Sequence, residues 1–127
     1  FLNPAQHARR LRPLLGHEAP GVDGLQSHVA VDSVPRDASA AALIASGLYE
    51  LCTYITPEKG KRYKSIADKI VGNLGRHYQA EPGTHYGFLL LHSTGHHPGG
   101  SEIDVPLNYA DYFYLEALAR KEALDNQ

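Results

Sequence analysis

Apolar residues recur every three or four positions over three stretches of the chain, which is the spacing that places side chains on one face of a helix. The first stretch predicts a helix that is capped by Asp37 or Ser39 and that ends near Tyr54. We expect its apolar face to consist of Ile44, Leu48, Leu51 and Ile55. Alanines at positions 38, 40, 41, 42 and 45 give this helix a thin side that another helix can approach closely.

A second helix is predicted to begin at Thr56-Pro57, where a capping residue precedes a proline, and to stop at Gly75. Its apolar face comprises Tyr63, Ile66, Ala67, Ile70 and Leu74. Only a tight connection separates this helix from the first, so we expect the two to form an antiparallel pair.

The third stretch predicts a helix from about Leu107 to Leu124, with an apolar face of Ala110, Phe113, Tyr114, Ala117 and Leu118. A weaker helix opens at Asn3-Pro4 and should be kinked by Pro13. Residues 16–36 are predicted to be a long loop, and residues 79–106 a loop with a short strand at Gly87 to Leu91. The pattern therefore predicts an all-α chain, built from antiparallel helix pairs with functional loops between them.

The composition is typical of a globular domain, with 43% hydrophobic and 20% charged residues. A formal charge of −2 argues against a nucleic-acid partner, which normally selects a basic surface. No apolar run approaches the roughly 18 residues of a membrane span, so we expect no membrane partner. The single cysteine, Cys52, is interpreted as a small buried hydrophobe. These features leave a cytoplasmic or a periplasmic location open.

The chain contains no methionine and begins at Phe1. We therefore expect either that its original N-terminus was removed or that it is a piece of a longer protein.

The richest candidate chemistry lies in the predicted loop at 92–104, because binding groups are often carried on loops of a rigid scaffold. This loop contains His92, Ser93, His96, His97, Ser101, Glu102 and Asp104. Serine hydroxyls can bind a sugar or a carboxylate, although they can equally cap local turns. The histidine spacing matches no ordered metal motif, so we expect these rings to line a polar cleft and predict no metal site.

Four further residues near this loop have two interpretations each. Arg36 could attract a uronate or a sulfate, but we favour an ion pair that holds the loop. Glu102 could bind a ligand, but we favour a structural role as a cap or an arginine partner. Asp111 is interpreted first as a structural residue, a buried and hydrogen-bonded carboxylate. Tyr109 belongs to an aromatic cluster, with Tyr112, Phe113 and Tyr114, that spans a full helical turn. Some members must therefore be core residues, while others could stack on a sugar.

Three stretches together resemble the unsaturated glucuronyl hydrolases, glycoside hydrolase family 88. They are VPRDASAAALIASGLYEL at 34–51, AEPGTHYGF at 80–88 and HSTGHHPGGSEIDVPLNYADYFYLEAL at 92–118. The resemblance implies an (α/α)6 barrel, or toroid, of six helix pairs. Twelve helices need about 350 residues at ordinary helix and loop lengths. Residues 1–127 would then be the C-terminal third of one such domain.

The family's reaction would be hydration of the C4=C5 double bond of the unsaturated uronic acid that ends lyase-generated chondroitin or hyaluronan oligosaccharides. An aspartate donates the proton and activates water, and the product rearranges and releases the neighbouring sugar. No cofactor is implied. The family's two catalytic aspartates lie in the N-terminal half, so we assign no catalytic residue here and expect this chain alone to be inactive. The resemblance implies that the substrate oligosaccharide contacts the loop wall, and the candidates are Ser93, Ser101, His92, His96 and Tyr109.

The chain also departs from the family. It contains no tryptophan, and LQSHVAVD at 25–32 replaces a tyrosine-tryptophan-aspartate stretch that is common in related sequences. Alternatives are therefore an unsaturated rhamnogalacturonyl hydrolase, which SEIDVP and PRDASAA fit less well, and a non-catalytic carbohydrate-binding remnant. A metal-binding protein is the weakest alternative. A piece cut from a barrel would expose apolar helix faces, so we also expect a tendency to self-associate.

Overall fold

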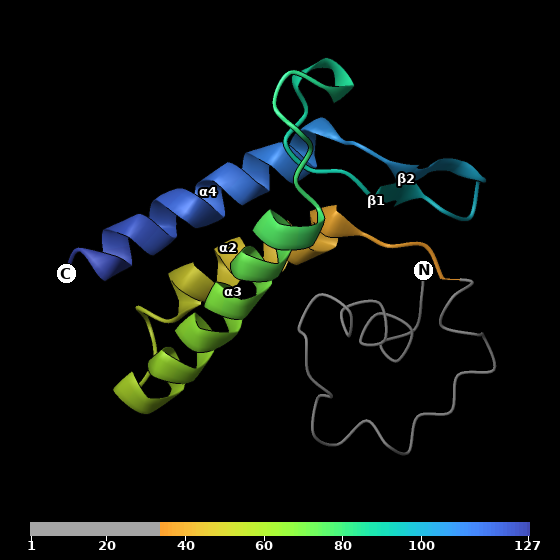
Figure 1. Ribbon diagram of the computed structural model, residues 1–127. Coiled ribbons are helices and arrows are strands. Elements are labelled where there is room, and N and C mark those ends of the chain that lie inside the picture. The colour runs from red at the N-terminus through yellow and green to blue at the C-terminus, as the bar shows by residue number, and fades with distance from the viewer. Residues whose placement is uncertain (1–33) are drawn as a thin grey trace.

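The computed structural model describes residues 34–127, which form three helices and a two-stranded hairpin (Figure 1). The elements are α2 (Ala38–Leu51), α3 (Pro57–His77), the 3-10 turn η2 (His85–Gly87), β1 (Ser93–His96), β2 (Ser101–Val105) and α4 (Asn108–Asp125). The chain is thus mostly helical over this range, as expected, but a hairpin occupies part of the predicted loop. The helix expected at Asn3-Pro4, most of the loop at 16–36 and the departure at 25–32 lie outside the described residues.

Helix α2 begins where the carboxylate of Asp37 accepts hydrogen bonds from the free backbone N–H groups of the first turn. These bonds come from Ser39 N at 3.1 Å and Ala40 N at 3.2 Å, and the Ser39 hydroxyl donates to the same oxygen at 2.6 Å. Of the two predicted caps, Asp37 is therefore the cap. The helix ends at Leu51, earlier than expected, because the chain turns at residues 52–55.

The buried face of α2 is its alanine face and not the face of large apolar residues. Ala38, Ala41, Ala42 and Ala45 are fully buried together with Tyr49, whereas Leu51 is 50% exposed. Ile44 and Leu48 are only partly buried against this core. The predicted face was wrong in this respect. The thin side meets α4, whose own small residues Ala110 and Ala117 are fully buried, so the two helices can approach closely.

Helix α3 returns antiparallel to α2, as predicted, and buries Ala67, Ile70 and Leu74. It continues through Gly75 to His77, so the predicted stop was wrong. The close approach of the two helices depends on Gly60. A Cβ atom there would lie 2.7 Å from the carbonyl oxygen of Cys52, which a side chain cannot tolerate. Cys52 itself is half-buried, less than expected, and its thiol donates to the Tyr49 carbonyl at 3.0 Å.

Helix α4 matches the prediction to within a residue at each end and lies on the other side of α2. Figure 1 shows that α4 runs in the same direction as α2, with α3 opposed to both. The start of α2, the start of α4 and the end of α3 therefore meet at one end of the helix layer. The chain between α3 and α4, which carries η2 and the hairpin, projects from that end.

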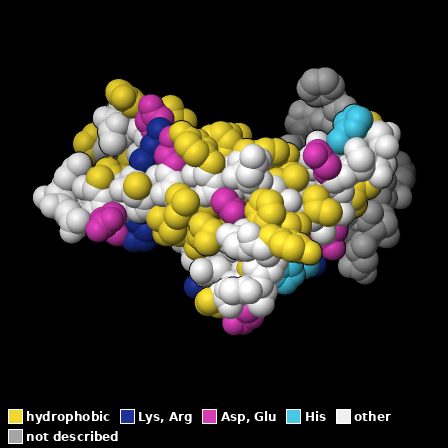
Figure 2. Space-filling view, turned by 90° about the horizontal axis from the view of Figure 1, so that it is seen from above, with side chains coloured by type: hydrophobic (Ala, Val, Ile, Leu, Met, Phe, Trp, Pro, Cys, Tyr) yellow, Lys and Arg dark blue, Asp and Glu magenta, His cyan; other side chains and the backbone are white. Residues whose placement is uncertain are grey.

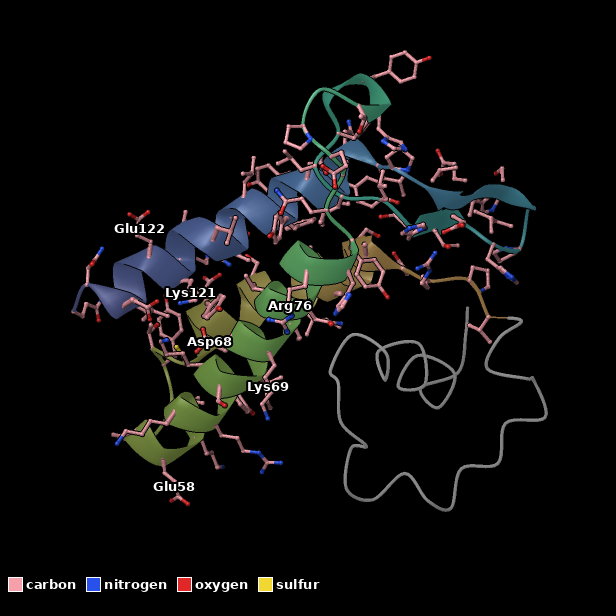
Figure 3. The ribbon with its side chains drawn as sticks, viewed as in Figure 1. Glu58, Asp68, Lys69, Arg76, Lys121 and Glu122 are labelled. Atoms are coloured by element: carbon pink, nitrogen blue, oxygen red, sulfur yellow. The ribbon has the colours of Figure 1, made fainter. Side chains whose placement is uncertain are left out.

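Two polar networks tie the helices together away from the hairpin. On one side, Arg120 of α4 donates to the carbonyl of Ser46 at 2.9 Å and pairs with Glu50 at 2.8 Å. On the other, the Tyr49 hydroxyl donates to Asp68 at 2.8 Å, and burial raises the pKa of Tyr49, with Asp68 adding to the effect. Figure 3 shows Lys121 of α4 directed toward Asp68 of α3, and the two charged groups are 3.9 Å apart.

The outer surface of this layer keeps several large apolar side chains in solvent. They are Leu43, Leu51, Tyr54, Tyr112, Leu115 and Leu118. Figure 2 shows hydrophobic side chains gathered in patches over the face seen from above. No helix within residues 34–127 is long and apolar enough to cross a membrane.

Candidate functional site

The polar segment singled out from the sequence forms an antiparallel hairpin that stands out from the helices (Figure 1). Ser93 pairs with Val105, Thr94 with Ile103, and His96 with Ser101, with an irregularity after Ser93. The strand expected at Gly87 to Leu91 is absent among the described residues. That segment contributes one isolated bridge, between Leu90 and Gln79, because the chain leaves the bridge at once to enter the hairpin.

The backbone of the hairpin is strained at three non-glycine residues. His92, Glu102 and Asp104 have positive φ angles of 65°, 52° and 57°. Such conformations cost about 1–3 kcal/mol each and persist where the surrounding structure enforces them, often at functional sites.

Hydrogen bonds to the start of α2 hold the base of the hairpin in place. The carbonyl of His92 accepts from Ala38 N at 3.0 Å, and the Thr94 hydroxyl donates to the carbonyl of Arg36 at 2.8 Å. Thr94 N also approaches the carboxylate of Asp37, at 3.4 Å. The same carboxylate therefore caps α2 and contacts β1, which fixes the hairpin to the helix layer.

A cluster of Arg36, Tyr78, His92 and Asp104 lies beside this base. Nδ1 of His92 is 2.8 Å from the Arg36 guanidinium and 2.7 Å from the Asp104 carboxylate. With Nδ1 protonated, the ring donates to Asp104; with Nδ1 unprotonated, it accepts from Arg36. Arg36 and Asp104 are 3.9 Å apart, so the structure contains the predicted ion pair between Arg36 and the loop.

Tyr78 forms the floor of this cluster. Its ring meets the His92 ring edge-on at 5.9 Å, and the Arg36 guanidinium lies 5.7 Å from its centroid. Burial raises the pKa of Tyr78, and the positive charge of Arg36 opposes that rise. The sequence analysis did not identify Tyr78 or Thr94, because a tyrosine at a helix end and a threonine in a loop carry no distinguishing pattern.

Asp111 is the second anchor of the segment between α3 and α4. Its two carboxylate oxygens accept from Leu89 N and Leu90 N, each at 2.9 Å. The first turn of α4 thus holds the backbone just before the hairpin. The structural role predicted for Asp111 is confirmed.

The predicted substrate-binding serines differ sharply in exposure. Ser93 is fully buried, and its hydroxyl has no hydrogen-bond partner among the described residues. Ser101 is exposed, with its hydroxyl 3.4 Å from Nδ1 of His96. The His96 ring lies over Gly99, where a Cβ atom would come within 2.3 Å of it. This glycine is therefore needed for the ring position. Figure 2 shows histidine side chains at the hairpin end of the molecule.

The remaining predicted residues lie at the edges of this site. Tyr109 is 42% exposed at the start of α4, where burial raises its pKa and a hydrogen bond with Ser39 opposes the rise. Within the aromatic cluster, Tyr114 is buried and Tyr112 exposed, so the cluster divides as predicted. Glu102 lies in β2 over Gly95, and its interpretation as a helix cap was wrong because α4 begins only at Asn108.

Within residues 34–127, no three His, Cys, Asp or Glu side chains come together in a group that could hold a metal ion. The arrangement offers hydroxyl and imidazole groups on the hairpin and a guanidinium group, that of Arg36, beside its base. Such groups bind polar and anionic ligands by hydrogen bonds.

Comparison with known proteins decides the relationship. No protein-family model matches the chain. The unsaturated glucuronyl hydrolase of Formosa agariphila is 42% identical over 95 residues, which are 74% of this chain and 23% of that protein. The crystal structure of an unsaturated glucuronyl hydrolase specific for heparin superposes with a TM-score of 0.72 and 47% identity, over 76% of this chain and 26% of that one. The chain is homologous to the unsaturated glucuronyl hydrolases.

A further solved unsaturated glucuronyl hydrolase is described as a mutant together with the oligosaccharide dGlcA-Glc-Rha-Glc. It matches with a TM-score of 0.64 and 29% identity, over 80% of this chain and 26% of that one. The chain spans about a quarter of the length of the unsaturated glucuronyl hydrolases that it matches. The family resemblance drawn from the sequence is thereby confirmed.

Proposed function

We propose that residues 1–127 form the C-terminal part of an (α/α)6-barrel domain of an unsaturated glucuronyl hydrolase. The observation that carries this proposal is the 47% identity, at a TM-score of 0.72, to the enzyme described as specific for heparin. The packing supports it, because α2 packs against both α3 and α4, running antiparallel to α3 and in the same direction as α4, an arrangement that suits successive helix pairs of such a barrel.

The reaction proposed for the whole protein is hydration of the C4=C5 double bond of a terminal unsaturated uronic acid. A carboxyl group upstream of this chain would donate a proton and activate water, and the hydrated product would rearrange and release the neighbouring sugar. Such chemistry requires an acid that is protonated near the working pH. The residues described here are assigned no catalytic role, and the reaction needs no cofactor.

The hairpin is proposed to form one wall of the substrate site. Ser101 and His96 lie near its tip, and His92 and Tyr109 lie near its base, where α2 and α4 begin. The N-terminal ends of two helices favour a negatively charged ligand such as a uronate carboxylate. Ser93 supplies a buried hydroxyl that has no partner among residues 34–127. Arg36 and Asp104 are positioning residues that hold His92.

The exposed apolar side chains on the outer surface of α2 and α4 fit the same proposal. In a complete barrel these faces would pack against neighbouring helix pairs. In the chain alone they remain in solvent, so self-association through them is expected.

The test uses the extended protein, which means these residues together with the coding sequence that precedes them. The extended protein is incubated with unsaturated disaccharides derived from heparin, chondroitin and rhamnogalacturonan, and the released sugars are identified. Release from the heparin or chondroitin disaccharide supports the proposal. Release only from the rhamnogalacturonan disaccharide would assign the protein to the alternative hydrolase. Binding without release would indicate a carbohydrate-binding remnant.

A further inference from the structure

The most exposed large hydrophobic side chain in the described part of the protein is Tyr86, at the tip of the arm formed by residues 80–88. Its relative exposure is 105%, which means that no described side chain covers its ring. Tyr54, the next in exposure, is at 75% and lies in the turn between α2 and α3, at the opposite end of the helix layer. The display of Tyr86 therefore needs an explanation.

The backbone that carries this ring has a strained conformation at the tip of the arm. His85 and Tyr86 have consecutive positive φ angles of 49° and 56°, in a region that non-glycine residues rarely occupy. Gly83 and Gly87, with φ angles of 79° and 88°, allow the chain to turn into and out of this conformation. Strain of this kind persists only where the rest of the structure enforces it, and it is concentrated at functional sites.

Hydrogen bonds hold the arm in place. The Thr84 hydroxyl donates to the carbonyl of Glu81 at 2.6 Å, and Gly87 N donates to the carbonyl of Thr84 at 3.1 Å. At the base of the arm, Ala80 N donates to the carbonyl of Leu89 at 2.9 Å, and Leu89 N is held by Asp111. The ring is therefore presented on an ordered support, which lowers the entropic cost of binding a ligand.

The arm and the hairpin leave the helix layer together. Both belong to the connection between the end of α3 and the start of α4, and Figure 1 shows them projecting from the same end of the layer in different directions. A ligand bound along the hairpin would therefore lie at the same end of the helix layer as the arm.

We propose that Tyr86 is a specificity-determining residue that stacks on a sugar of the substrate beyond the unsaturated uronic acid. The proposal rests on the proposed function. A tyrosine ring offers an apolar face to the C–H face of a pyranose and a hydroxyl to its polar rim. Because the unsaturated uronic acid must reach the reacting groups elsewhere in the protein, an outlying aromatic ring can contact only the sugars that follow it. Tyr86 therefore discriminates by chain length.

The test compares Tyr86→Ala with Tyr86→Phe in the extended protein, with Tyr54→Ala as the matched control. The KM and kcat are measured for an unsaturated disaccharide and an unsaturated tetrasaccharide of the same polymer, together with the thermal unfolding midpoint. We expect Tyr86→Ala to raise the KM for the tetrasaccharide about two- to tenfold, the range set by loss of an aromatic stacking contact, with little change in kcat or in unfolding. Tyr86→Phe should keep most of the affinity, and Tyr54→Ala should change neither constant.

Unchanged KM values in Tyr86→Ala would overturn the proposal. If the thermal unfolding midpoint were lowered while the KM values stayed unchanged, the Tyr86 ring would instead pack against another part of the protein. Calorimetric titration of the tetrasaccharide separates this inference from the proposed function. If the unsubstituted protein binds the tetrasaccharide without turnover and Tyr86→Ala weakens that binding, the contact stands while the enzymatic assignment fails. If the unsubstituted protein neither binds nor turns over the tetrasaccharide, both fail.

Discussion

Individual residues were predicted well where a local rule fixes their role. Asp37 caps α2 and Asp111 accepts backbone hydrogen bonds, because a carboxylate beside free N–H groups has few better partners. An ion pair of Arg36 that holds the loop was predicted, but its partner, Asp104, was not named. Ser93 was harder to interpret, because nothing in the sequence distinguishes a buried hydroxyl from an exposed one such as Ser101. Tyr78 was missed because its importance arises from contacts with residues distant in the chain.

Asp111 offers the sharpest residue-scale prediction. Asp111→Ala in the extended protein leaves Leu89 N and Leu90 N without their acceptor, and Leu90 is fully buried. We expect a loss of at least about 1.5–3 kcal/mol in the free energy of unfolding, measured by urea denaturation, since a single bond to a charged group contributes that much and two are removed. Asp111→Asn keeps one acceptor oxygen and should lose less. Equal stability of Asp111→Ala and the parent protein would refute the anchoring role.

At the scale of elements, helices were predictable and the hairpin was not. Caps, prolines and apolar periodicity located α2, α3 and α4 to within a few residues. Apolar periodicity did not identify which face of α2 packs against the neighbouring helices. Closely packed helices meet through alanine, whereas a search for apolar periodicity gives most weight to large residues such as leucine. The hairpin escaped prediction because its strands are only four and five residues long, β1 contains no large apolar residue, and three of the residues in or beside the strands adopt positive φ angles.

Larger side chains in the alanine contact between α2 and α4 should destabilise the fold. We expect Ala45→Leu to destabilise the chain of residues 1–127 by about 1–3 kcal/mol, because Ala45 is fully buried and overpacking forces the helices apart. Ala119→Leu on the exposed part of α4 is the control and should change the free energy of unfolding by less. The measurement is denaturant unfolding of both variants, and similar effects of the two would argue against a tight α2–α4 contact.

The end of α4 should contribute a pH-dependent part of the stability. Lys121 and Lys64 lower the pKa of Asp125, and Lys64 lies 2.6 Å from its carboxylate. Because the folded-state pKa is below the ordinary aspartate value of 3.8, this contribution is present above that pH and is lost as the pH falls through the lowered pKa. We expect Asp125→Asn to be less stable than the parent at neutral pH and equally stable in strong acid.

Unfolding curves of Asp125→Asn and the parent at several pH values check this expectation. Glu122→Gln is the control, since Figure 3 shows Glu122 directed away from α3. If the difference in the free energy of unfolding between Asp125→Asn and the parent stayed constant down to strong acid, the proposed dependence of stability on the ionisation of Asp125 would be contradicted.

At the scale of the whole molecule, the family relationship was readable from three short sequence stretches, and the homology covers 74% of the chain. The complete substrate site could not be predicted from the sequence, because the chain corresponds to about a quarter of its relatives' length. The exposed apolar faces of α2 and α4 and the hairpin at one end of the layer are together what a segment of a larger barrel would show. We therefore propose that this chain forms one wall of an active site whose reacting groups lie elsewhere in a longer protein.

The most direct test of this claim follows the ultraviolet absorbance of an unsaturated disaccharide, which is lost when the conjugated double bond is hydrated. The chain alone and the extended protein are assayed side by side on the heparin- and chondroitin-derived disaccharides. We predict no loss of absorbance with the chain alone and steady loss with the extended protein. Loss with the chain alone would show that it contains catalytic groups, whereas no loss with a folded extended protein would contradict the assignment as an unsaturated glucuronyl hydrolase.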